Sequence, residues 1–154
     1  MSIYFLDSSA LVKRYASEKG TSWLQGLLEP SNGHSIIISR LTQAEIMSAV
    51  SRQKREGAVS LQAAQAIRGL LDRHAWREYT IIEVMQQIIY RAEDLLEKHP
   101  LRAYDAVQLA SALESNIRLT AMGLSSLTFI AADQRLLSVA VIEGLMTDDP
   151  NTHP

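Results

Sequence analysis

Short apolar runs alternate along this chain with longer stretches in which apolar residues recur every three or four positions. The first run, Ile3–Leu6, stops at Asp7-Ser8-Ser9 and passes into Ala10-Leu11-Val12, which predicts a buried strand, a tight turn and the start of a helix. Runs at residues 36–38, 80–82, 127–131 and 145–147 predict further short strands. Because strands that alternate with helices favour right-handed crossovers, we expect an α/β protein with a three-layer α/β/α fold. Its short parallel sheet should have four or five strands flanked by helices.

The chain shows no sign of division into parts. No repeat, linker or low-complexity segment interrupts its 154 residues, so we expect one domain over residues 1–147 and a polar, frayed tail over residues 148–154. Cysteine is absent, which excludes disulfides, thiolate metal sites and a cysteine nucleophile. There is no signal-peptide pattern and no apolar run near the length of a membrane span. We therefore expect a cytoplasmic protein without membrane contact.

The charge balance argues against binding of nucleic acid through an overall positive charge. The formal net charge is -2, from 15 basic and 17 acidic residues, so no global positive field attracts nucleic acid. Any such contact has to be local, although a dense basic group is more often a solvated helix face. The basic side chains that we consider for local contact are Lys13, Arg14, Arg52 and Arg102.

Several common kinds of site find no support in the sequence. There is no G-x-x-x-x-G-K-[ST], no G-x-G-x-x-G and no G-x-S-x-G, which argues against nucleotide-binding loops and a hydrolase nucleophile elbow. The histidines show no zinc-site pairing. The side chains that remain to carry chemistry are carboxylates.

The candidate acids stand at comparable places in the predicted fold: Asp7, Glu45, Asp105 and Asp133. The first and last come just after predicted strands, and the other two stand near the start of helices. Each also has a purely structural interpretation. Asp7 and Asp133 are good helix caps, and Asp105 suits the first turn of a helix. The segment Thr42-Gln43-Ala44-Glu45 fits a capping box. Glu45 also lies one helical turn from Leu41 and from Ala49, which favours a side chain that points toward the protein interior. Both interpretations stay open.

Together these acids favour a metal site. Carboxylates gathered at one edge of a sheet repel one another unless they are protonated or neutralised by a cation. Oxygen ligands without histidine or cysteine suit Mg²⁺ or Mn²⁺, and such sites hydrolyse phosphodiester bonds. We expect Asp7 and Asp105 to be inner ligands, and Glu45 and Asp133 to complete a second metal position or to orient water. Ser9 would support a carboxylate by a hydrogen bond.

Four segments resemble the four acidic motifs of PIN domains, in the order that this family shows. They are Phe5-Leu6-Asp7-Ser8-Ser9-Ala10-Leu11-Val12-Lys13, Leu41-Thr42-Gln43-Ala44-Glu45, the segment LRAYDAVQLA at residues 101–110 and the segment FIAADQRL at residues 129–136. The resemblance implies a PIN-like fold and a Mg²⁺- or Mn²⁺-dependent endoribonuclease with Asp7, Glu45, Asp105 and Asp133 as its acidic site and Ser9 as the supporting hydroxyl. Because the motifs fill a small single domain, the chain most resembles VapC toxins of type II toxin-antitoxin pairs. That implies an RNA substrate, a homodimer and a small cognate antitoxin that inserts a segment near the acidic cleft.

One position departs from the family pattern. The family usually carries serine or threonine two residues before the fourth acid, and this chain has Ala131. The missing hydroxyl is expected to weaken the orientation of Asp133 or of metal-bound water. It keeps open the alternative of a catalytically weak PIN-like module that binds RNA or a protein partner.

Two other enzyme classes begin with a similar strand. A haloacid-dehalogenase-like phosphatase needs a second aspartate two residues after the first, where this chain has Ser9. A phosphoryl-accepting receiver domain needs an acceptor aspartate after a central strand, where the strand at residues 80–82 is followed by Glu83. Both classes are therefore disfavoured.

Overall fold

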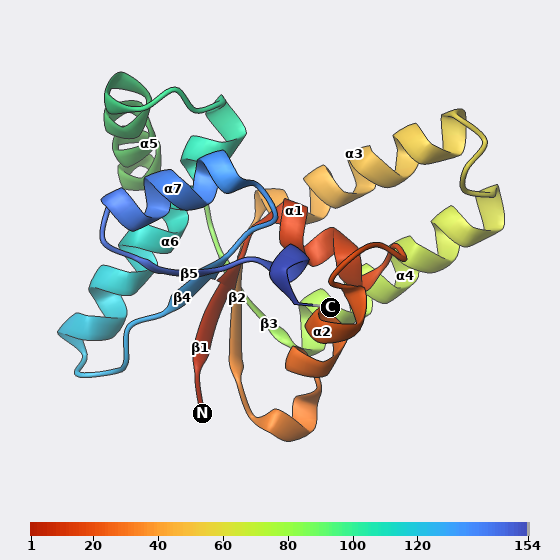
Figure 1. The fold of residues 1–154 in the computed structure, drawn as a ribbon, viewed down its shortest axis with the longest axis horizontal. Coiled ribbons are helices and arrows are strands. Elements are labelled where there is room, and N and C mark those ends of the chain that lie inside the picture. Colours follow the sequence, from red (N-terminus) through yellow and green to blue (C-terminus); the bar gives the residue numbers. More distant parts are fainter. Residues whose placement is uncertain (154) are drawn as a thin grey trace.

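A computed structural model describes residues 1–153 and shows a single parallel sheet (Figure 1). The strands are β1 (Ile3–Leu6), β2 (Ser35–Ser39), β3 (Tyr79–Ile82), β4 (Thr128–Ile130) and β5 (Met146–Asp148). They lie in the order β3-β2-β1-β4-β5, and each neighbouring pair is parallel. The predicted α/β/α architecture with a short parallel sheet is confirmed.

Helices connect the strands and cover both faces of the sheet. The α-helices are α1 (Ser8–Leu11), α2 (Thr21–Leu27), α3 (Leu41–Arg55), α4 (Leu61–Arg77), α5 (Gln86–Lys98), α6 (Ala103–Ala121) and α7 (Gln134–Ile142). Short 3₁₀ turns are η1 (Val12–Arg14), η2 (Pro30–Asn32) and η3 (Pro150–Thr152). None of the helices described is long and apolar enough to cross a membrane.

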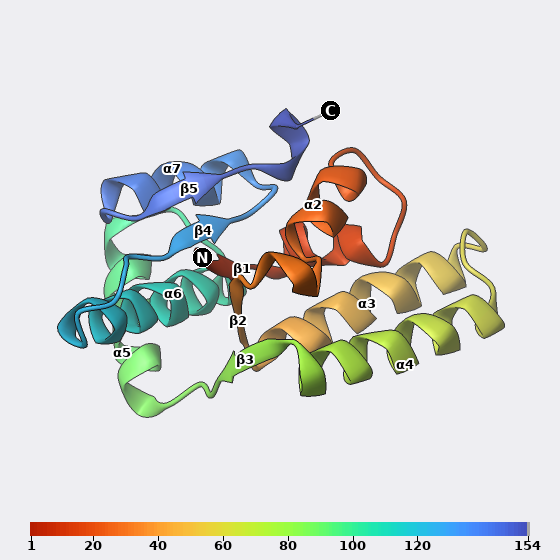
Figure 2. The same ribbon diagram turned by 90° about the horizontal axis from the view of Figure 1, so that it is seen from below.

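The sheet separates two apolar cores, because successive residues of a strand point to opposite faces. Phe5 of β1 belongs to a core formed with α5, α6 and α7, which includes Leu109 and Leu136. Leu6, the next residue, belongs to a core formed with α1 to α4, which includes Ile46 and Leu71. Figure 2 shows the two groups of helices on either side of the sheet. The helices α3 and α4 lie side by side and extend away from the sheet as the α3–α4 arm (Figures 1 and 2).

The strand order places a crevice at one edge of the sheet. From β1 the chain passes to β2 and β3 on one side, and later to β4 and β5 on the other. The order therefore reverses at β1 and β4, and ligands of open parallel sheets bind outside the carboxyl ends of strands at such a reversal. Asp7 follows the end of β1, and Asp133 lies in the loop after β4.

Two helices differ from the boundaries expected from the sequence. Helix α1 begins at Ser8, earlier than the predicted start at Ala10, because the Asp7 side chain accepts a hydrogen bond from the Ala10 backbone N–H and caps the helix. The stretch rich in alanine and leucine predicts a helix from Tyr104 to Glu114, but α6 continues to Ala121. Its last turns are retained because Leu119 packs against the core of α5, α6 and α7.

The prediction of a frayed tail is wrong for residues 148–153. Strand β5 runs through Asp148, and the buried Asp149 caps the turn η3. The ring of His153 stacks on Trp23 with centroids 4.0 Å apart, and its Nε2 lies 2.8 Å from Oδ1 of Asp148. These contacts tie down a terminus whose polar composition had indicated disorder. Pro154 lies outside the described residues, and the single-domain extent stays a prediction.

Candidate active site

Asp7 is a buried carboxylate held by two donors. Its side chain is 2% exposed, and its Oδ1 accepts hydrogen bonds from the Ser9 hydroxyl at 2.7 Å and the Ala10 N–H at 3.1 Å. Burial, together with the charge of Glu45, raises the pKa of Asp7 to about 7 although these hydrogen bonds oppose the shift. Ser9 also accepts a hydrogen bond from the Ala132 N–H at 2.9 Å, which ties Asp7 to the loop that carries Asp133.

Glu45 points inward and does not belong to a capping box. Helix α3 begins at Leu41 without a side-chain cap, and the hydroxyl of Thr42 instead accepts a hydrogen bond from Gln108 Nε2 at 3.0 Å. Gln108 Nε2 also donates to Oε1 of Glu45 at 2.7 Å, and the Ser8 hydroxyl donates to Oε2 at 2.8 Å. Both carboxylate oxygens of Glu45 are therefore held in place, and the inward interpretation is confirmed.

Asp105 and Asp133 are the more accessible acids. Asp105 lies in the first turn of α6, and Asp133 caps α7 by accepting hydrogen bonds from the N–H groups of Arg135 at 2.9 Å and Leu136 at 3.3 Å. Burial and the charge of Asp133 raise the pKa of Asp105, while Arg102 and Arg135 oppose this shift. The two acids are thus electrostatic neighbours, although they come from different helices.

The four predicted acids are successive electrostatic neighbours, and we call them the acidic cluster (Asp7, Glu45, Asp105 and Asp133). Beyond the effect of burial, the charge of Glu45 raises the pKa of Asp7, and the charge of Asp105 raises the pKa of Glu45. Asp133 acts in the same way on Asp105. Within residues 1–153, none of the four forms an ion pair with a basic side chain. Like charges therefore face one another, and the nearby Arg102 and Arg135 offset only part of the repulsion at Asp105.

The acidic cluster suits a hard divalent cation in the type of its donors. Among the described residues, no three histidine, cysteine, aspartate or glutamate side chains are close enough to form a ready-made metal site. The donors are nevertheless all carboxylate oxygens, which Mg²⁺ and Mn²⁺ prefer. A cation between them would replace mutual repulsion with attraction. The residues present therefore fit such an ion.

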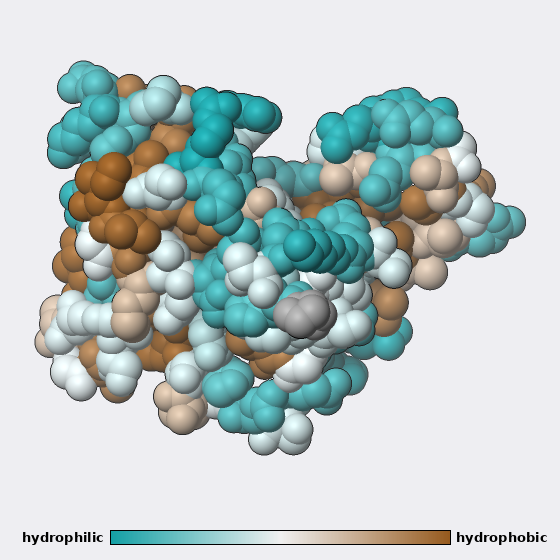
Figure 3. Space-filling view, in the orientation of Figure 1, coloured by the Kyte–Doolittle hydropathy of each residue, from teal (hydrophilic) through white to brown (hydrophobic). Residues whose placement is uncertain are grey.

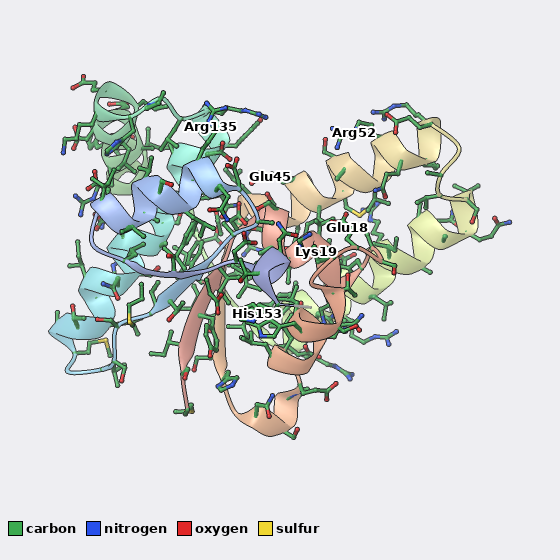
Figure 4. All side chains as sticks on the ribbon, in the orientation of Figure 1. Glu18, Lys19, Glu45, Arg52, Arg135 and His153 are labelled. Atoms are coloured by element: carbon green, nitrogen blue, oxygen red, sulfur yellow. The ribbon has the colours of Figure 1, made fainter. Side chains whose placement is uncertain are left out.

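An open cleft adjoins the acidic cluster. Its volume is about 410 Å³, and Ser8 and Glu45 form part of its lining. Figure 3 shows the surface hollowed between the α3–α4 arm and the lobe that contains α5, α6 and α7. Figure 4 shows Glu45 at the base of this hollow, between Arg52 on α3 and Arg135 at the start of α7. The acidic cluster is thus accessible from one side.

The structure divides the basic residues considered from the sequence into two groups. Lys13 is buried and forms an ion pair with Glu18 at 3.0 Å, and Arg14 forms one with Glu78 at 2.7 Å. Arg52 and Arg102 instead line the cleft. Only these last two are placed to meet a ligand there.

Sequence reasoning missed two residues that hold Glu45, namely Ser8 and Gln108. Gln108 stands three residues after Asp105 in a helix face that is otherwise rich in buried apolar residues, and it is fully buried. A buried amide requires a partner, so its position in an apolar face was a usable signal. Ser8 gave no such signal, because serine is common at the start of any helix.

Comparison with known proteins places the chain in a family. The PIN domain profile matches residues 4–142. The chain belongs to the PIN domain family. This PIN domain is 31% identical over 114 residues to Ribonuclease VapC45 from Mycobacterium tuberculosis strain CDC 1551 / Oshkosh, and the match covers 73% of this chain and 76% of the relative. Ribonuclease VapC49 from strain ATCC 25618 / H37Rv gives the same identity and the same coverage. The resemblance inferred from the four motifs is confirmed.

Solved structures share the fold over nearly the whole PIN domain. The structure of VapBC2 from Rickettsia felis, bound to a DNA fragment from its promoter, matches with a TM-score of 0.65 at 18% identity, covering 96% of this chain and 98% of that chain. Mycobacterium tuberculosis VapC20, described as a sarcin-ricin loop cleaving toxin, matches with a TM-score of 0.58 at 17% identity, covering 94% of this chain and 97% of that chain. Identities this low show a shared fold.

Ala131 occupies the position where PIN domains usually carry a hydroxyl. It is fully buried, and its backbone N–H donates to the Asp148 carbonyl at 3.3 Å. The neighbouring Ala132 N–H is the group that Ser9 binds. The loop before Asp133 is thus held through its backbone, and a loss of activity from Ala131 stays a prediction.

Proposed function

We propose that this PIN domain is a Mg²⁺- or Mn²⁺-dependent endoribonuclease that hydrolyses phosphodiester bonds in RNA. The acidic cluster carries the proposal, because its buried and half-buried carboxylates form no salt bridge within residues 1–153 and raise one another's pKa values. Such clusters mark functional sites more often than structural ones. The names of the two mycobacterial relatives, both called ribonucleases, support the same activity.

In this proposal the four acids divide into two pairs with different tasks. Asp7 and Asp105 hold the ion, and Glu45 and Asp133 orient the attacking water or complete a second ion position. When bound, the ion supplies a water of lowered pKa and stabilises the charge that develops on the phosphate. Ser9 fixes the orientation of Asp7 through its hydrogen bond of 2.7 Å.

We extend the proposal to the biological setting of the chain. It is the toxin of a VapBC-type pair, acts in the cytoplasm as a homodimer, and is inhibited by a small cognate antitoxin that binds near the acidic cleft. The VapBC2 structure supports the antitoxin, as does a toxin-antitoxin complex from Klebsiella pneumoniae, which matches with a TM-score of 0.59 at 19% identity and covers 96% of this chain and 97% of that chain. The homodimer rests on the family resemblance.

The deciding experiment measures cleavage of a structured RNA by antitoxin-free protein. Parallel reactions contain Mg²⁺, Mn²⁺ or EDTA, and use the wild-type protein and the Asp105→Asn variant. Asp94→Asn is the matched control, because Asp94 is an exposed aspartate on α5. We expect cleavage that requires the metal, disappears in the folded Asp105→Asn variant and persists in the control.

The opposite result would favour the alternative of a binding module. If several RNAs are bound but none is cleaved with either metal, the chain acts as an RNA-binding or partner-binding PIN-like protein. Ala131→Ser is then the informative variant, because it restores the hydroxyl that the family usually carries. Cleavage that appears only in Ala131→Ser would show that this position had weakened the enzyme.

A further inference from the structure

The cleft beside the acidic cluster extends well beyond the acids themselves. One wall is a face of α3 on which Glu45, Ala49 and Arg52 follow one another at helical spacing. Arg52 stands seven positions after Glu45, which corresponds to a rise of about 10 Å along the helix. Arg52 therefore stands farther along the cleft than Glu45, where it can bind another phosphate of the same strand.

The opposite wall comes from the start of α6. It contributes Arg102 and Tyr104, the latter directly before Asp105 in the chain. Tyr104 is 63% exposed, and it differs from the similarly exposed Tyr90 in lining the cleft beside the acidic cluster. Its side chain forms no hydrogen bond within residues 1–153, so the ring has no visible role in the fold.

The cleft combines the chemical features of a single-strand binding groove. Arg52 and Arg102 line it, and within the described part of the chain neither forms an ion pair. Single strands are bound by positive side chains that follow the backbone and by aromatic rings on which bases stack. A cleft of about 410 Å³ accommodates a small organic group such as one nucleotide.

We propose that the cleft binds an unpaired nucleotide next to the cleaved bond, with its base stacked on Tyr104 and with neighbouring phosphates contacted by Arg52 and Arg102. This inference rests on the proposed ribonuclease function and adds the residues that recognise the strand. Tyr104 selects unpaired RNA, because a base inside a duplex does not expose its face for stacking. The two arginines provide positive charge inside the cleft, although the protein as a whole has a net charge of -2.

The test measures binding separately from cleavage. All proteins carry Asp7→Asn, and the ligand is a short fluorescein-labelled RNA of randomised sequence, either single-stranded or annealed to a complementary pool. Fluorescence anisotropy gives the Kd. We expect Tyr104→Ala to weaken single-strand binding about 5- to 150-fold, and Tyr104→Phe to change it less than about 2-fold because stacking needs only the ring. Tyr90→Ala is the control, since Tyr90 is 58% exposed on α5 and should have no effect.

The arginines are tested through the dependence of Kd on salt. Removing one phosphate contact lowers the slope of log Kd against log salt by about 0.7 for a single strand. We expect this for Arg52→Gln and for Arg102→Gln, but not for Arg118→Gln, an exposed arginine near the end of α6.

The outcomes separate this inference from the proposed function. If Tyr104→Ala binds single-stranded RNA as the Tyr90→Ala control does, the inference is wrong and the cleft has another occupant, such as a protein segment. Equal affinity for the duplex, or no binding of either RNA, also overturns it. Metal-dependent cleavage by the wild-type protein would leave the ribonuclease proposal standing in each of these cases. Binding that depends on Tyr104 without any cleavage would support the cleft assignment and contradict the enzyme.

Discussion

Two polar clusters in this protein differ in whether their charged side chains form ion pairs. In the acidic cluster, carboxylates within residues 1–153 raise one another's pKa values and form no salt bridge. In a second group, which we call the arginine-tyrosine cluster (Arg14, Tyr15, His74, Glu78 and Tyr79), charge is compensated. Arg14 pairs with Glu78 at 2.7 Å, and the Tyr15 hydroxyl lies 3.0 Å from that of Tyr79 and 2.9 Å from Nδ1 of His74. Burial and the nearby Arg14 lower the pKa of His74, which favours its neutral form.

The positions of the two clusters match this difference. The arginine-tyrosine cluster joins the turn η1 to the end of α4 and to Tyr79, the first residue of β3. Asp7 lies instead after the last residue of β1, at the edge where parallel sheets bind ligands. A compensated cluster stabilises the contact between elements, whereas an uncompensated one costs stability unless something else is bound. The comparison predicts that changes in the two clusters affect different properties.

The largest effect is expected from Asp7→Asn. Removing one member of a catalytic unit lowers cleavage by about 1,000-fold or more, because the other members act only together with it. The melting temperature of the metal-free variant should stay the same or rise, since asparagine also caps helices and carries no charge to bury. Cleavage assays and thermal denaturation in EDTA check both parts, with Asp94→Asn as control. A clear fall in the melting temperature would place Asp7 with the structural residues instead.

The next effect concerns pH and the metal-free protein. Asp7 has a pKa of about 7 in the folded state against 3.8 ordinarily, so between these values the native state keeps a proton that the unfolded state has released. Stability therefore falls as pH rises through this window, by up to about 1.4 kcal/mol per pH unit. The groups that face Asp7 are Glu45, whose charge strengthens the effect, and Ser9, whose hydroxyl opposes it. Urea unfolding in EDTA from pH 4 to pH 8 measures the slope, and Asp7→Asn should flatten it.

A smaller effect, on stability alone, is expected from Arg14→Met. The change breaks a largely buried ion pair and leaves Glu78 without its partner, which costs about 3 kcal/mol. Cleavage well below the melting temperature should stay within about 2-fold of wild type. Urea unfolding compares this variant with Arg68→Met, which removes an exposed arginine from α4. Loss of cleavage in a fully folded Arg14→Met protein would contradict a purely structural role for the arginine-tyrosine cluster.

The smallest effect is expected from Tyr79→Phe. The ring stays buried while the hydroxyl that meets Arg14 and Tyr15 is lost, so the free energy of unfolding should fall by about 1 kcal/mol. The cost should shrink when Arg14→Met is already present, because the two side chains share one network. A double-mutant cycle by urea unfolding measures this coupling. Strict additivity would show that the hydroxyl acts independently of Arg14.

Much of the acidic cluster was predictable, because each acid belongs to a local pattern. Asp7 ends an apolar run and opens a helix, and Asp133 stands between a strand and a helix in the same way. Parallel strands bring their carboxyl ends to one edge of the sheet, so predicting the strands also predicted that the acids following them lie near one another. The capping box that the sequence allows at Thr42 does not form, because the Thr42 hydroxyl accepts a hydrogen bond from Gln108, 66 residues away in the chain.

The amino-acid sequence by itself determined the alternation of strands and helices, the family motifs and the identity of the four acids, since these depend on neighbouring residues. Only the tertiary structure decided which charges are compensated. It paired Arg14 with Glu78, left Arg52 and Arg102 facing the cleft, and tied down His153 against Trp23. Ion pairs, stacking and burial depend on distances between residues far apart in the chain, and those distances exist only once the two cores have packed against the sheet.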